Sequence, residues 1–176
     1  MLTWAFVALS VVYIGLLLAD IGVLAAADTI VDRAADDPAS MLTAASARVL
    51  RLGDQLNSLT LVWIWVYLAG FIAWTAFSRR RAQRLGYDRR QVLRHWTFVA
   101  WRLSLVLVFA MSLVVANRKL PANTDMATLR DAFIGHSHAL MGYTAVRIAM
   151  IGLLSSYVII VWRRLTDRRP AEAAAA

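Results

Sequence analysis

The residues of this sequence that could do chemistry are charged side chains inside apolar segments. Asp20 interrupts the apolar run "GLLLADIGVL", and Arg102 and Arg147 interrupt two later runs. A charge at the centre of a membrane segment costs about 2.5–3.5 kcal/mol on the mildest insertion scales, so it should pair, reach the headgroups or face water. Arg102 lies only about 9 Å from the start of its run and can reach the headgroups.

The depths of Asp20 and Arg147 predict that they meet. At about 1.5 Å of rise per residue, Asp20 lies roughly 24 Å beyond Trp4, and Arg147 lies roughly 22 Å before Trp162. We therefore predict an ion pair between the first and last apolar segments, with Tyr143 one turn from Arg147. Such a pair would fix helix register more than it adds stability. The alternatives are a functional site at this cluster, either a proton-linked carboxylate or a ligand pocket, and an Asp20 that reaches the outer interface by itself.

The only three histidines, His95, His136 and His138, are candidates for haem or metal binding. Two histidines on facing helices can hold haem b in a bundle. His95 starts the third apolar segment, however, whereas His136 and His138 precede the fourth, so one haem cannot bridge them. The two rings of "HSH" also point about 200° apart on a helix, which disfavours chelation. We expect interfacial polar residues and no cofactor. Haem b is the alternative and would need an external ligand or a second chain.

No recognised catalytic motif occurs in the sequence. The chain has no cysteine, which excludes thiol chemistry and thiolate metal sites. It has no Gly-rich phosphate loop, H-E-x-x-H or G-x-S-x-G pattern. We therefore assign no catalytic or metal-binding residues, and a non-enzymatic protein is favoured.

The segments that position these residues have the composition of membrane spans. Of the 176 residues, 60% are hydrophobic, more than a soluble domain of this size can bury. Spanning a hydrocarbon core takes about 20 helical residues, and four runs are long enough. We predict an all-α fold, an integral membrane four-helix bundle, in a single domain over residues 1–169, with a disordered tail at 170–176. The predicted spans are about 4–26, 59–77, 96–116 and 139–162.

The arginines predict the orientation of the protein in the membrane. Seven of them lie in the loop after the second span and four in the tail, against six basic residues in the other two loops. Basic segments that flank spans stay in the cytoplasm. This places both termini on the cytoplasmic side of the plasma or inner membrane. Because the charge collects at the edges of spans, we expect lipid contact and no nucleic-acid binding. The predicted headgroup-binding residues are Arg79, Arg80, Arg81, Arg84, Arg89 and Arg90.

Two segments on the opposite side are predicted to be helical extensions of the spans. After Asp36 or Asp37 as a cap and Pro38 in the first turn, apolar residues from 42 to 63 recur every three or four positions. A similar stripe from 126 to 147 follows a cap at Asn123 or Thr124. Each stripe needs a partner. We expect the two extensions to pack against each other, with the membrane surface or another protein as alternatives.

The stretch "FIAWTAFSRRRAQRLGY", followed by an aromatic start to the next span, resembles an uncharacterised bacterial family of four-span membrane proteins defined only as a domain of unknown function. The resemblance covers the second span, the basic loop and the third span, and it implies no activity. The sequence favours a structural or accessory protein that binds a lipid, a partner subunit or a second copy of itself. The alternative is a small transporter or ligand-sensing protein that uses Asp20, Tyr143 and Arg147.

Overall fold

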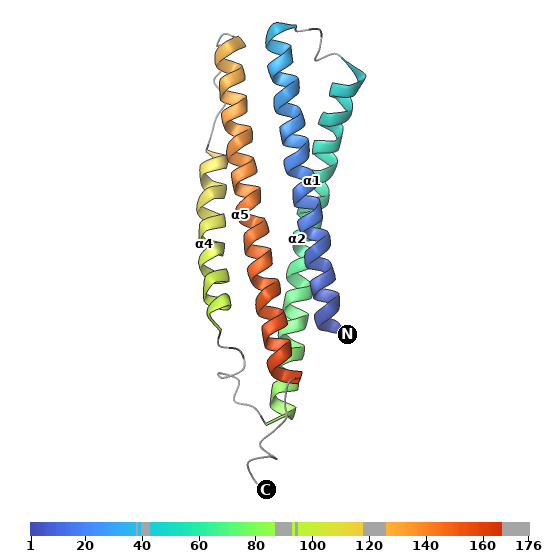
Figure 1. Ribbon diagram of the computed structural model, residues 1–176, viewed down its shortest axis with the longest axis vertical. Coiled ribbons are helices and arrows are strands. Elements are labelled where there is room, and N and C mark those ends of the chain that lie inside the picture. The colour runs from blue at the N-terminus through green and yellow to red at the C-terminus, as the bar shows by residue number, and fades with distance from the viewer. Residues whose placement is uncertain (38, 40–42, 87–92, 94, 118–125, 167–176) are drawn as a thin grey trace.

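The protein is all-α over the residues that its computed structural model describes, which are 1–37, 39, 43–86, 93, 95–117 and 126–166. Four long helices account for nearly all of them, and no strand occurs in these ranges (Figure 1). The helices are α1 (Leu2–Asp36), α2 (Ala44–Arg84), α4 (Trp96–Ala116) and α5 (Met126–Thr166).

Each of the four helices is long and apolar enough to cross a membrane. The 21 residues of α4 rise about 31 Å, close to the thickness of a hydrocarbon core. The 41 residues of α2 and of α5 rise about 62 Å each, so both helices extend well beyond one span. The 35 residues of α1 also exceed one span, with a rise of about 52 Å.

The end of α1 and the start of α2 differ from the boundaries that the sequence predicted. The first span was predicted to end at about residue 26, but α1 continues to Asp36. The cap of α2 is therefore not Asp36 or Asp37. It is Thr43, whose hydroxyl accepts a hydrogen bond from the Ser46 N–H at 3.2 Å. Pro38, the other expected cap residues Asn123 and Thr124, and the predicted tail lie outside the described residues.

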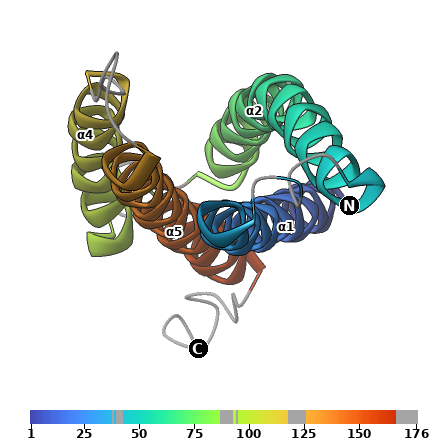
Figure 2. The same cartoon turned by 90° about the horizontal axis from the view of Figure 1, so that it is seen from above.

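The helices pack side by side in the order α2, α1, α5, α4 (Figure 2). Helix α1 runs antiparallel to both of its neighbours, and within the described residues the backbone of α4 approaches only that of α5. We call the end where α1 begins the basic end and the opposite end the distal end. At the distal end α1 lies between the extensions of α2 and α5 (Figure 1). The expected packing of these two extensions against each other is therefore wrong, because the lengthened α1 separates them.

Aromatic side chains form the core near the basic end. Trp74 is 1% exposed, and its indole N–H donates to the Thr3 hydroxyl at 3.2 Å. Its ring lies 5.9 Å from that of Tyr157 on α5, and the Phe71 ring lies 5.3 Å from that of Trp101 on α4. These contacts join α2 to α5 and α4 although the α2 and α4 backbones stay apart, so side chains close this end of the helix assembly.

Helix α4 is the most exposed of the four. Thr97 is its only buried residue among those described. Val99, Leu103, Val106 and Phe109 are each more than half exposed. An apolar helix with so little buried surface is stable only where lipid or another protein covers it.

Candidate functional site: a polar ladder between α1 and α5

Four polar contacts cross the interface between α1 and α5, and we call them the polar ladder. Because the helices are antiparallel, residues later in α1 meet residues earlier in α5. In an apolar protein such contacts are costly to build unless they are satisfied, so they mark the candidate site. From the basic end toward the distal end, the contacts join Tyr13 to Arg147, Asp20 to Thr144, Asp28 to His138 and Asp32 to Arg130.

Two tyrosines hold the Arg147 side chain. Its guanidinium donates a hydrogen bond to the Tyr13 hydroxyl. It also lies over both rings, 5.7 Å from the centroid of Tyr13 and 5.4 Å from that of Tyr143. Contacts of this kind are worth about 0.5–2 kcal/mol each. Tyr13 is 2% exposed, whereas Arg147 and Tyr143 are partly exposed. The Tyr143 hydroxyl has no hydrogen-bond partner among the described residues.

The carboxylate of Asp20 bonds to a different residue. It accepts a hydrogen bond from the Thr144 hydroxyl at 3.4 Å. Asp20 and Arg147 interact electrostatically, but no ion pair joins them within the part of the chain that the structure describes. The direct pair that we predicted is therefore not formed.

The reason is the direction in which the arginine extends. Thr144 occupies the position opposite Asp20, and Arg147 lies one turn nearer the basic end of α5. From there the guanidinium reaches Tyr13, which lies two turns from Asp20 along α1. The structure thus places Asp20, Tyr143 and Arg147 in one region, but it gives each charge a neutral hydrogen-bond partner.

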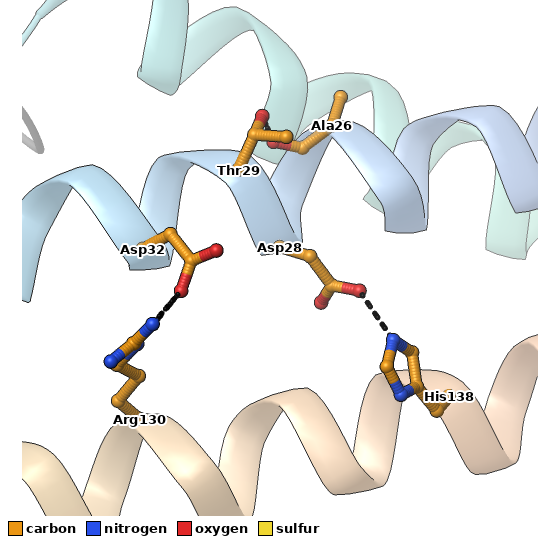
Figure 3. A network of polar contacts seen from close by, with 6 residues as sticks. All are labelled: Ala26, Asp28, Thr29, Asp32, Arg130 and His138. Atoms are coloured by element: carbon orange, nitrogen blue, oxygen red, sulfur yellow. Dashed lines mark hydrogen bonds and ion pairs between the residues drawn. The ribbon is translucent and has the colours of Figure 1, made fainter.

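The distal half of the ladder consists of contacts between ionisable side chains (Figure 3). Two nitrogens of Arg130 contact one carboxylate oxygen of Asp32, at 2.6 and 2.7 Å, and both side chains are about half exposed. His138 Nε2 lies 3.7 Å from Asp28 Oδ2. Sequence reasoning missed these contacts because Asp28 and Asp32 were assigned to a loop. Their spacing of one helical turn was the signal that could have revealed them.

The histidines occupy opposite ends of the molecule. The Nδ1 of His95 accepts from the Thr97 N–H at 3.3 Å and caps α4 at the basic end. His138 faces Asp28, and the Nδ1 of His136 is buried without a partner among the described residues. No group of three or more metal-ligating side chains occurs in the described ranges.

The basic end gathers arginines from two helices. The Arg81 guanidinium lies 4.7 Å from the ring centroid of Trp162, which brings the last turns of α2 and α5 together. The expected headgroup-binding residues Arg89 and Arg90 lie outside the described residues. The exposed arginines on these last turns are Arg79, Arg80, Arg84, Arg163 and Arg164.

Comparison with known proteins finds no match to a protein-family model, to a curated protein or to a solved structure.

Proposed function

We propose that the protein is a multi-pass protein of the plasma or inner membrane, of structural or accessory type, that binds anionic lipid headgroups at its basic end. The observation that carries the proposal is the contact between Arg81 and Trp162. It brings together the last turns of α2 and α5, which carry the exposed arginines, at the ends of two apolar helices. Arginines beside an anionic membrane surface contribute about 1 kcal/mol each.

The orientation in this proposal follows from charge. Basic segments that flank spans stay in the cytoplasm, so the basic end is cytoplasmic and both termini lie on that side. At the distal end the long helices continue past the end of α4 (Figure 1). This end would therefore project outside the membrane.

The structural or accessory role is supported by the polar ladder. Its polar groups contact one another across α1 and α5, which supports a role in setting the register of these two helices. The exposed apolar face of α4 leaves a surface for lipid, a partner subunit or a second copy of the chain.

Lipid retention tests the proposed headgroup site. The protein would be purified in a neutral detergent, and bound phosphatidylglycerol would be counted by native mass spectrometry. Replacing Arg79, Arg80 and Arg84 by glutamine removes about 3 kcal/mol of attraction, so affinity should fall about a hundredfold. The matched control replaces Arg48 and Arg51, which are exposed near the distal end. An equal loss in the control, or none in the triple variant, would refute the headgroup site.

Cysteine labelling tests the orientation, because the chain has no cysteine of its own. Single cysteines would replace exposed Leu85 at the basic end and exposed Asp54 near the distal end. A membrane-impermeant maleimide added to intact cells should label Asp54→Cys only. Labelling of Leu85→Cys alone would reverse the proposed topology.

A ligand-sensing or transport function is the second candidate, and one observation favours it. Asp20 and Arg147 each bond to a neutral side chain, so both charges stay available to a proton or a ligand. If Asp20→Asn leaves folding intact but abolishes proton-coupled uptake or ligand binding, this candidate replaces the structural role. If Asp20→Asn changes stability alone, the structural role stands.

A further inference from the structure

We infer that Arg147, Tyr13 and Tyr143 form a binding site for the carboxylate of a monoanionic organic acid, near the middle of the membrane-crossing region. The site is separate from the proposed headgroup patch, which lies at the basic end of α2 and α5. Either of two acids could supply the carboxylate, one dissolved in water or one dissolved in the bilayer.

Contacts with α4 place Arg147 at mid-depth. The Tyr157 ring lies 5.0 Å from that of Phe98 at the start of α4, and Arg147 is about ten residues, or roughly 15 Å, farther along. Toward the distal end, Gly142 packs against Met111. This contact puts Arg147 roughly 15 Å below the end of α4. Both measures place the guanidinium near the centre of a helix about 31 Å long, where burying a charge is most costly.

The site has more hydrogen-bond donors than acceptors. A guanidinium carries five N–H donors. Among the described residues, Arg147 makes one hydrogen bond, to Tyr13. The Tyr13 oxygen accepts this bond, which leaves its own O–H to donate. The Tyr143 hydroxyl is unpartnered in the described part of the chain. These unpaired donors are complementary to a ligand that carries acceptors, and a carboxylate accepts up to four hydrogen bonds.

The residues around Arg147 favour a ligand with a single negative charge. Arg147 supplies one positive charge, and Asp20 is close enough to interact with it electrostatically. A dianion such as phosphate would place a second negative charge near Asp20 at mid-depth. The two tyrosine rings beside the guanidinium offer apolar surface to the body of an organic acid.

The aromatic core lies on the basic side of Arg147. Trp74 and Tyr157 join α2 to α5, and Phe71 and Trp101 join α2 to α4, all on the basic side of Arg147. The α2 and α4 backbones share no contact. Arg147 is partly exposed, so a small acid can reach it without unfolding a helix.

Equilibrium binding of two radiolabelled acids to the detergent-purified protein tests the site. Benzoate represents a water-soluble acid, oleate a membrane-dissolved acid, and benzamide is the uncharged control. Arg147→Gln should weaken binding of whichever acid binds by tenfold or more, since bonds to a charged group are the strongest ones lost. Arg102→Gln, at another exposed arginine of an apolar helix, should leave binding unchanged, as should the triple arginine variant of the basic end.

Tyr143→Phe keeps the test decisive if Arg147→Gln fails to fold. The variant retains the ring and removes a hydroxyl that makes no hydrogen bond among the described residues, so it should fold normally. Its affinity for the acid should fall about threefold to tenfold, the value of one hydrogen bond. Binding of benzoate alone identifies a soluble source, and binding of oleate alone identifies the bilayer. The inference is overturned if neither acid binds or if unlabelled benzamide displaces the bound acid as well as the unlabelled acid does. It is also overturned if the affinity for the acid is unchanged in both Arg147→Gln and Tyr143→Phe.

Discussion

The two tyrosines beside Arg147 allow a direct test of how the polar ladder stabilises the fold. Their rings lie at nearly the same distance from the guanidinium, 5.7 Å for Tyr13 and 5.4 Å for Tyr143. Only the Tyr13 hydroxyl accepts a hydrogen bond from Arg147. Replacing each tyrosine by phenylalanine keeps the ring and its attraction for the cation. Any difference between the two variants therefore reports on the hydroxyl.

The expected cost differs clearly between the two variants. A hydrogen bond to a charged group contributes about 1.5–3 kcal/mol in soluble proteins. Polar contacts between membrane helices average about 0.6 kcal/mol and reach about 1.7. Tyr13 is buried, so water cannot easily replace its hydroxyl, and Tyr13→Phe should lower the free energy of unfolding by about 0.6–1.7 kcal/mol. Tyr143→Phe should change it by less than about 0.5 kcal/mol.

The assay is SDS-induced unfolding in mixed micelles, followed by the fluorescence of the seven tryptophans. Each change would be repeated in an Arg147→Gln background to close a double-mutant cycle. The cost of Tyr13→Phe should largely disappear there, because its donor is gone. Two results would refute the reasoning: equal costs for the two tyrosine variants, or a cost of Tyr13→Phe that is undiminished without Arg147.

The same titration checks three further predictions. Trp74→Ala should lower the free energy of unfolding by about 3–5 kcal/mol, because it leaves a cavity in the aromatic core. Trp65→Ala, at a 71% exposed side chain, should lower it by less than about 1 kcal/mol. Similar costs for the two variants would contradict the assignment of the core. Gly70→Val should destabilise the fold, because even a Cβ there comes within 3.2 Å of an α1 side chain. Gly22→Ala has open space around it and should stabilise the fold by about 0.5–1 kcal/mol. The reverse order of stabilities would contradict the α1–α2 packing. Gly86→Ala should cost about 1–2 kcal/mol, because Gly86 has a φ of 70° just after α2, and a neutral result would contradict that backbone conformation.

Local patterns in the sequence predicted the helical segments well and their ends less well. Residues 96–116 were predicted as a span and form α4 with the same bounds. The continuation of α1 to Asp36 was missed, because Asp28 and Asp32 reduce the apolar signal that marks a span. Those acids are stable in a helix because His138 and Arg130 lie opposite them on α5. A contact between residues about a hundred positions apart in the chain leaves no mark on the local pattern.

The sequence by itself determined that four apolar helices form, and it predicted that Asp20 and Arg147 lie in the first and last of them at similar height. Composition and helical rise are sufficient for both statements, since they depend only on neighbouring residues. Only the tertiary structure decided which groups bond to these charges. A rotation of a helix by one residue turns a side chain through about 100°, and an arginine reaches more than one turn along its neighbour. The packing of α1 against α5 thus placed Thr144 opposite Asp20 and Tyr13 within reach of Arg147.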